Sequence, residues 1–231
     1  MSIILRQEEK YALASEEAVC YTNRFAQFLQ TDTYSVDGSY MVRSLYFDTP
    51  DDKDFFDKLN EQNLRRKIRL RIYHPQNHHV KLELKQKENM YQKKQTLLIS
   101  RSDAAALIEG RHSVLLQYQQ PLAAELYTIM AGEAYRPRSI VEYRRRSFVA
   151  NGNNIRITFD SYINATEMNF DLFSHTLPLY PVMSRQKTIL EIKYNQFLPG
   201  YLSGILSQIE RNRISASKYC LSRQLGYPHS L

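Results

Sequence analysis

The sequence predicts an α+β fold in which eight antiparallel strands close into a barrel (a tunnel) and helices pack on its outside. Many short segments alternate apolar and charged residues with a period of two, which is typical of strands with one buried face. Polar turns join several of these segments, which favours hairpins and therefore antiparallel pairing. Eight strands are enough to close a barrel that holds side chains or one small ligand.

The strands are expected where period-two alternation coincides with β-branched or aromatic residues. These segments lie at about 4–11, 40–48, 65–73, 79–88, 93–100, 138–149, 155–163 and 186–195. "NGNN" at 151–154 predicts a hairpin turn, because Asn and Gly tolerate a positive φ. "HPQNHH" at 74–79 predicts a looser turn.

Helices are expected between and after the strands, at 16–29, 51–60, 102–109, 121–131, 200–210 and 215–225. Ser15 is the predicted N-cap of the first helix, with Glu16 and Glu17 in the first turn where the helix dipole favours acidic groups. Thr49 with Pro50 predicts the start of the second helix, and Asp48 is expected to cap the turn that leads into it.

The composition is that of one folded domain with an anionic partner. No Gly/Ser linker or internal repeat divides the 231 residues, so a single domain is expected over 1–231. Apolar residues make up 43% and charged residues 24%. The net charge of +7 and the sequence pI near 9.3 favour nucleic acid, phosphate compounds or an acidic membrane surface as the partner.

We expect a cytoplasmic protein. Cys20 and Cys220 are the only cysteines, and both lie in predicted helices, which suits a reducing compartment better than a disulfide scaffold. The N-terminal "MSIILRQEEKYAL" has too short an apolar run for a signal peptide. No segment approaches the ~20 apolar residues that span a bilayer, so no transmembrane segment is expected.

One strand face carries almost only charge. Lys67, Arg69 and Arg71 share a face of the 65–73 strand because side chains alternate between the two faces. On one hairpin this pattern is ordinary, since exposed strand faces are often rich in lysine. The pattern recurs, however, at Arg6, Glu8 and Lys10, at Lys81, Glu83, Lys85 and Lys87, at Arg156, Thr158 and Asp160, and at Glu191 and Lys193.

The repeated charged faces predict an enclosed site for a polyanion. Each opposite face is apolar and must be buried; if outer helices bury these faces, the charged faces line the interior of the barrel. Buried cations without a counterion cost several kcal/mol per group, so the lining calls for an anionic ligand. Glu8, Glu83, Glu191 and Asp160 could pair with the cations, and one or more could hold a divalent metal through oxygen ligands.

Eight short motifs resemble one known family. They are "RQEEKY", "SLYFDT", "RRKIRLR", "VKLELKQK", "VEYRRRSF", "IRITFD", "LEIKY" and "SKY". In order and spacing, from about residue 5 to 222, they are similar to the polyphosphate polymerase domain of the vacuolar transporter chaperone proteins, within the CYTH-like superfamily of triphosphate tunnel metalloenzymes. Each motif alone is weak, whereas eight in the right order are specific.

The resemblance implies an eight-stranded tunnel that transfers the γ-phosphate of ATP to a growing polyphosphate chain with a divalent metal, Mn²⁺ or Mg²⁺. The lining residues that it implies are Lys10, Arg69, Arg71, Lys85, Arg145, Arg156 and Lys218, with Glu191 as the metal ligand. We also expect Lys67, Lys93, Glu83 and Lys193 to contact the substrate. Relatives in membrane complexes carry a phosphate-sensing domain and transmembrane helices, so this chain resembles the free-standing version; a membrane partner that exports the product stays open.

The chain departs from the family at one position of the lining. The family has Lys-x-Arg in the fifth strand, whereas "YQKKQTLL" offers Lys93 or Lys94 followed by Gln95. The register leaves open which of the two lysines faces the ligand. A missing cation there would weaken one phosphate contact.

Two other functions fit the same residues. If water accepts the phosphoryl group, the protein is an inorganic triphosphatase, and the lining does not separate this from polymerisation. A basic surface with many of the 17 tyrosines could instead be a nucleic-acid-binding module without catalysis, although alternation places the cations and the apolar groups on opposite faces. The histidines lack zinc spacing, and no Gly-rich phosphate loop precedes a helix.

Overall fold

The computed structural model describes residues 6–35, 38–89, 91–150, 152–209, 213–215 and 217–223. The chain divides into two compact units, and each is described by itself. Unit 1 comprises Met1–Met41, Tyr143–Ile163 and Met183–Ala216; unit 2 comprises Val42–Glu142, Asn164–Val182 and Ser217–Leu231. One domain over 1–231 stays a prediction. The expected strand start at 4 and the helix end at 225 lie outside the described residues.

The elements follow the order expected from the sequence, with three short additions. Unit 1 holds β1 (Arg6–Ala14), α1 (Ser15–Phe28), β2 (Gln30–Thr31), β10 (Lys187–Asn195) and α5 (Gly200–Leu206). Unit 2 holds α2 (Lys53–Leu59), β4 (Leu64–Ile72), β5 (His79–Glu88), β6 (Tyr91–Ser100), α3 (Arg101–Ile108), the 3-10 helix η1 (His112–Gln117), α4 (Pro121–Gly132), β9 (Tyr180–Pro181) and α6 (Lys218–Arg223). Three strands have residues in both units: β3 (Tyr40–Asp48), β7 (Arg136–Ala150) and β8 (Ile155–Thr166). The short β2, η1 and β9 were not predicted.

The prediction of a closed eight-stranded barrel is wrong. The strands form a ten-stranded sheet in the order β1-β10-β8-β7-β3-β4-β5-β6, with β2 on β7 and β9 on β8. Among the described residues this order has two ends, β1 and β6, and no ladder joins them. Alternation reports only which face of a strand is buried, whereas closure depends on the tilt and stagger of the strands. The pattern therefore could not decide whether the sheet closes.

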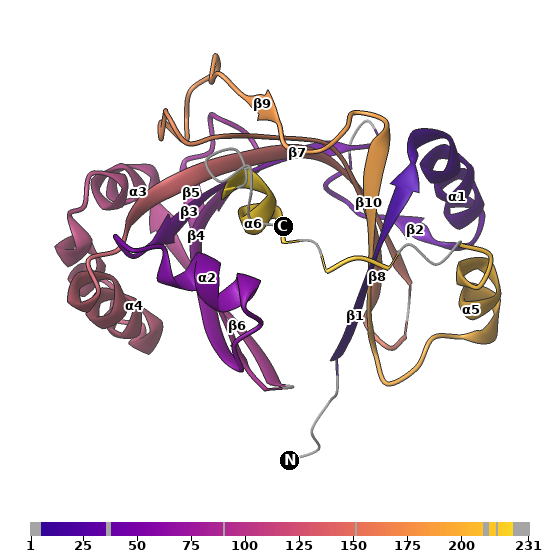
Figure 1. Ribbon diagram of the computed structural model, residues 1–231, viewed down its shortest axis with the longest axis horizontal. Coiled ribbons are helices and arrows are strands. Elements are labelled where there is room, and N and C mark those ends of the chain that lie inside the picture. Colours follow the sequence, from indigo (N-terminus) through magenta and orange to yellow (C-terminus); the bar gives the residue numbers. More distant parts are fainter. Residues whose placement is uncertain are drawn as a thin grey trace. The chain divides into compact units, whose positions relative to one another are not determined.

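Helices cover the apolar face of the strands in unit 2. Leu70 on β4, Leu82 on β5 and Leu97 on β6 belong to one buried cluster with Leu107 of α3 and Leu126 of α4. Figure 1 shows α3 and α4 together beside these strands. Because this face is fixed against the helices, the charged side chains at alternate positions must lie on the other face.

Unit 1 is built in the same way from different helices. Ile157 on β8 and Ile192 on β10 pack in one buried cluster with Phe25 of α1 and Leu202 of α5. In Figure 1, α1 and α5 lie on the same side of β1, β8 and β10. The charged residues at alternate positions of these strands, such as Lys10, Arg156 and Glu191, therefore lie on the face away from α1 and α5, whereas Glu9 of β1 lies on the other face.

Two helix starts differ from the prediction. Ala14, not Ser15, is the N-cap of α1, and its backbone N–H donates to the Glu17 carboxylate at 2.8 Å. The second helix begins at Lys53, because the Lys53 N–H donates to Thr49 Oγ1 at 3.0 Å and leaves the intervening residues as a turn. The longest described helix, α1, has 14 residues, and none in the described part of the chain is long and apolar enough to cross a membrane.

Two buried carboxylates lie where β3 meets α2 in unit 2. Asp48 accepts hydrogen bonds from the backbone N–H groups of Thr49 (2.8 Å), Asp54 (2.9 Å) and Phe55 (3.0 Å), which confirms the predicted cap. Asp54 accepts from the Tyr135 hydroxyl at 2.9 Å. Burial raises the pKa of Asp54 to about 7, and the nearby Asp48 charge acts in the same direction.

We predict that Asp54→Asn removes one component of the pH dependence of stability. Between about pH 4 and pH 7 folded Asp54 holds a proton that the unfolded chain has lost. The free energy of unfolding should therefore fall as the pH rises through this window, on the order of 1 kcal/mol per pH unit. Urea unfolding of both proteins measures it, and a difference between them that stays constant with pH would contradict the assignment.

Candidate functional site

The strands β4, β5 and β6 of unit 2 present a face dominated by cations. Residues directly opposite each other in a ladder share a face. The register places Lys67 opposite Lys85, Arg71 opposite Lys81, and Lys85 opposite Lys94. We name this surface the basic face, which consists of Arg65, Lys67, Arg69, Arg71, Lys81, Glu83, Lys85, Lys87 and Lys94.

This register costs stability in the absence of a ligand. Like charges directly opposite each other on a sheet are destabilising, and the ladders set Arg65 against Lys87 as well as the three pairs above. The packing of the apolar face prevents a slip to another register, since a shift by one residue would expose the core side chains. An anion on the basic face would offset the repulsion.

Glu83 is the one acidic residue among the described residues of the basic face. Its buried carboxylate accepts from Arg69 Nε at 2.7 Å, forms an ion pair with Lys94, and lies 3.8 Å from Arg71 Nη1. Burial opposes its ionisation, but the three cations outweigh this effect and hold the pKa of Glu83 well below its usual value. One carboxylate thus lies among several cations.

Two of the four arginines of β4, Arg69 and Arg71, are held in place by hydroxyl groups of β3. Arg69 Nη1 donates to the Tyr46 hydroxyl at 3.0 Å, and Arg71 Nε donates to Ser44 Oγ at 3.1 Å. The Arg69 guanidinium also lies over the Tyr46 ring, 5.7 Å from its centroid. These neutral partners fix the side chains without cancelling their charge, so both arginines are pre-organised for an anion.

The structure decides between Lys93 and Lys94. Glu88 lies opposite Tyr91, so Lys94 is opposite Lys85 on the basic face, whereas Lys93 is opposite Gln86 on the other face. Lys93 therefore lies away from Arg69 and Glu83. The predicted strand began two residues late, but an even shift leaves the faces unchanged, so the choice between the lysines needed the pairing with β5.

The start of α6 lies against the basic face. Ser217 Oγ accepts from Lys67 Nζ at 2.6 Å, and the Tyr219 ring stacks on Tyr46 with centroids 5.1 Å apart. Lys218, the first residue of α6, is half-buried between these two contacts. The helix thus brings a predicted lining residue, distant in sequence, to the same face as Arg69.

Unit 1 has a second charged face, but there the charges are balanced. It contains Glu8, Lys10, Arg145, Arg156, Asp160, Glu191 and Lys193. The β1–β10 ladder sets Glu8 opposite Lys193 and Lys10 opposite Glu191, which are favourable pairs. Lys10 Nζ also lies 2.9 Å from the Glu8 carboxylate. This surface, named here the balanced face, has less excess charge to attract an anion.

Arg145 and Arg156 already have anionic partners on the balanced face. Arg145 donates two parallel hydrogen bonds to the buried Asp160 carboxylate, at 2.6 and 2.7 Å. Arg156 Nη2 donates to Asp32 at 2.6 Å and to the Tyr40 hydroxyl at 3.0 Å. Burial opposes the charge of Arg145, yet the adjacent Asp160 raises its pKa well above the usual value.

Glu191 and Glu8 fit a metal that arrives with phosphate, not a metal held by protein alone. Lys193 Nζ lies 3.8 Å from Glu8 and is paired with Glu191, so one ammonium group joins the two carboxylates. The described residues contain no group of three His, Cys, Asp or Glu side chains that could hold a metal ion. Mg²⁺ is commonly bound by one or two carboxylates together with substrate phosphates, and this donor set meets that need.

The predicted site residues therefore form two groups. Lys67, Arg69, Arg71, Glu83, Lys85 and Lys218 lie together in unit 2, and Lys10, Arg145, Arg156, Glu191 and Lys193 lie together in unit 1. Lys93 is apart from both. The sequence left Lys94 open as the alternative to Lys93, and it did not predict Tyr46, Ser217 or Tyr219 as parts of the site. The motifs "SLYFDT" and "SKY" contain these three residues, but nothing in them indicated a role in the site.

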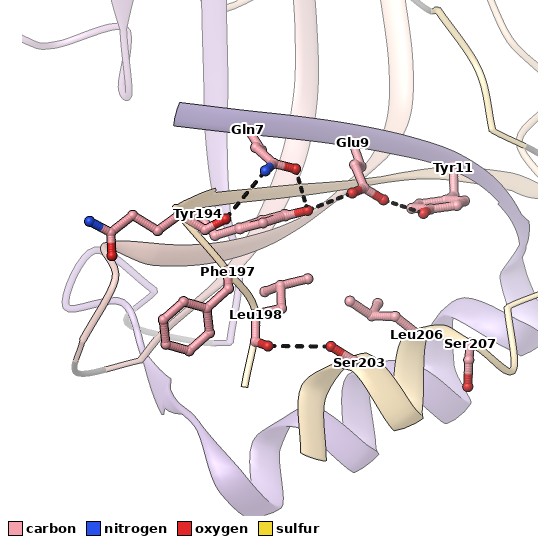
Figure 2. Close-up of a pocket in the computed structure, with 10 residues that line it drawn as sticks. Gln7, Glu9, Tyr11, Tyr194, Phe197, Leu198, Ser203, Leu206 and Ser207 are labelled. Carbon is pink, nitrogen blue, oxygen red and sulfur yellow. Dashed lines mark hydrogen bonds between the residues drawn. The ribbon is translucent and has the colours of Figure 1, made fainter. Parts of the chain in front are cut away.

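A pocket of about 520 Å³ lies on the other side of β1 and β10. Figure 2 shows Gln7, Glu9, Tyr11 and Tyr194 above α5, with the Glu9 carboxylate accepting from the hydroxyls of Tyr11 (2.5 Å) and Tyr194 (2.7 Å). None of the predicted site residues lines this pocket, because they alternate with Glu9 and Tyr11 along the strand.

Comparison with known proteins identifies the family to which the chain belongs. The VTC domain family matches residues 5–227, so the chain belongs to the VTC domain family. Curated proteins gave no match to the chain.

Solved structures share the fold at low sequence identity. A candidate adenylate cyclase from Bacillus halodurans is 12% identical, with a TM-score of 0.54, covering 94% of each chain. The PH1012 protein from Pyrococcus horikoshii is 10% identical, with a TM-score of 0.51, covering 95% of this chain and 99% of that one. These similarities concern the fold alone.

We predict that Lys94→Ala weakens the binding of tripolyphosphate while Lys93→Ala leaves it unchanged. Both variants remove one positive charge from β6, but only Lys94 lies on the basic face. At low ionic strength, where exposed charges are least screened, the loss for Lys94→Ala should be about fivefold in Kd. Titration calorimetry measures both variants. Equal losses of affinity in the two variants would mean that the net charge of the protein decides the affinity, whichever face of β6 the lysine lies on.

Proposed function

We propose that the protein is a metal-dependent phosphotransferase that moves the γ-phosphate of ATP onto a growing chain of inorganic polyphosphate. The observation that carries this proposal is the basic face of unit 2, where cations oppose cations and Glu83 is the one carboxylate described. Membership of the VTC domain family supports the same conclusion.

The basic face suits an extended phosphate chain better than a single anion. Its cations recur at every second residue along β4 and, except at Glu83, along β5, and neighbouring strands lie about 4.8 Å apart. Arg69 and Arg71 can each donate two parallel hydrogen bonds to phosphate oxygens, whereas lysines such as Lys67 and Lys85 act as movable point charges. The pre-organised arginines would set the register of the chain, and the lysines would follow its length.

Phosphoryl transfer needs positioning and charge stabilisation more than a protein nucleophile. Arg69 and Arg71 would stabilise the negative charge on the transferred group and orient it. Glu191, with Glu8, would hold Mn²⁺ or Mg²⁺, and such an ion neutralises charge on phosphate oxygens when bound. Lys10 lies 2.9 Å from the Glu8 carboxylate, and Lys193 is paired with Glu191.

Polymerisation and hydrolysis differ only in the acceptor of the phosphoryl group. The purified protein is incubated with ATP and manganese, and the products are separated by gel electrophoresis. Chains that lengthen with time support the polymerase. Release of orthophosphate from ATP or tripolyphosphate without longer chains would contradict the polymerase and indicate a triphosphatase that uses the same face.

The aromatic ring beside Arg69, Tyr46, is not available for stacking of nucleic-acid bases. Base stacking needs exposed rings, but Tyr46 is buried and covered by Tyr219. Polyphosphate should therefore displace an oligonucleotide completely at low salt. Binding of the oligonucleotide that resists polyphosphate would favour a nucleic-acid-binding module.

We predict that Arg69→Ala lowers kcat/KM for chain growth by about 10²-fold, because a pre-organised charged donor to the transferred group is lost. Arg111→Ala is the matched control, since this exposed arginine pairs with Glu109 next to η1. Glu191→Gln should abolish manganese-dependent turnover while tripolyphosphate still binds. Equal activity of the Arg69 and Arg111 variants would contradict the assignment of the basic face.

A further inference from the structure

The helix α6 is held in unit 2 by buried polar contacts. It has six residues, which is far too short for a helix to be stable by itself. Tyr219, Ser222 and Arg223 are all buried. Its position is therefore set by what these side chains bind.

The Tyr219 hydroxyl donates to Asp48 at 2.5 Å, and Asp48 is completely buried. The same carboxylate accepts the backbone N–H groups at the start of α2. Asp48 thus joins the end of β3, the start of α2 and the first turn of α6. A phenylalanine would fill the space of the Tyr219 ring, so the hydroxyl serves orientation rather than packing.

The other end of α6 is fixed by separate contacts. Ser222 Oγ lies 2.8 Å from Ser139 Oγ, and Arg223 donates to Asp52 and Glu167, each at 2.6 Å. Because Ser222 and Arg223 hold the other end, we expect a small change at Tyr219 to shift the first turn of α6 without releasing the whole helix. A substitution at Tyr219 can therefore change the position of the first turn while α6 stays folded, which makes the role of Tyr219 testable.

The first turn of α6 contacts the basic face on both sides of Lys218. Ser217 accepts from Lys67, and the Tyr219 ring stacks on Tyr46 with 24° between the ring planes. The Tyr46 hydroxyl in turn accepts from Arg69. A chain of contacts therefore runs from Asp48 through Tyr219 and Tyr46 to Arg69.

We propose that Asp48 and Tyr219 are positioning residues of the phosphate site, which fix the first turn of α6 so that Lys218 and Arg69 act on the same phosphate chain. This inference rests on the proposed phosphate-binding function of the basic face. It assigns a role in substrate binding to two buried residues that do not themselves touch the substrate.

The test compares Tyr219→Phe, Lys218→Ala and the double variant in tripolyphosphate binding by calorimetry. Tyr219→Phe keeps the ring and removes only the hydrogen bond to Asp48, and we expect a loss of about tenfold in affinity. If Tyr219 acts through Lys218, the double variant should bind no more weakly than the weaker of the two single variants. Tyr118→Phe is the matched control, because its hydroxyl donates to Asp103 at 2.6 Å away from the basic face.

Hydrogen exchange of the backbone amides in 218–223 provides the second readout. Exchange should be faster in Tyr219→Phe than in wild type and unchanged in Tyr118→Phe. Wild-type affinity in Tyr219→Phe, or additive losses in the double variant, would overturn the inference while leaving the phosphate site intact. Failure of the wild-type protein to bind tripolyphosphate would instead overturn the proposed function, and the inference with it.

Discussion

The structure of unit 2 depends on one buried carboxylate that lies among more positive charge than it can neutralise. Glu83 binds Arg69 and Lys94 and lies near Arg71, while the ladders around it set cation against cation. The cations cannot turn away, because the opposite face of the same strands is packed against α3, η1 and α4. Packing on one side of the strands thus keeps an excess of positive charge on the other, and an anion bound there would reduce the repulsion.

The charged faces of the two units differ in their balance of charge. In unit 2 the excess of positive charge favours binding of phosphate. In unit 1 the opposite pairs Glu8–Lys193 and Lys10–Glu191 leave the balanced face nearly neutral, and its carboxylates are the oxygen donors that a divalent cation prefers. Arg145 is committed to Asp160, so it serves the integrity of this face in the ligand-free protein. The lining residues implied by the family resemblance therefore differ in their surroundings: those of unit 1 are paired with carboxylates, whereas those of unit 2 mostly lie opposite other cations.

Local sequence patterns predicted the positions of the long strands. The closure of the sheet and the contacts between residues distant in sequence could not be predicted from them. Alternation located the eight long strands and their buried faces, since the period of two is a property of each strand alone. It could not reveal that no ladder joins β1 and β6 within the described part of the sheet, because closure depends on the tilt and stagger of the strands. The sequence left Lys93 and Lys94 open because two adjacent lysines both fit the alternation, and only the pairing of β6 with β5 places Lys94 on the basic face. The role of Tyr219 in the site could not be predicted from the sequence, because its partners Asp48 and Tyr46 are distant in sequence.

Thermal unfolding in the presence of tripolyphosphate tests the central claim, that the basic face is built for an anionic chain. A ligand that binds only the folded state raises Tm with its concentration, by about 5 to 10 °C at a hundredfold excess over Kd. Tripolyphosphate should therefore raise Tm well beyond the effect of potassium chloride at the same ionic strength. An identical shift with both salts would mean that the repulsion on the basic face is relieved by screening alone, and it would contradict a specific phosphate site.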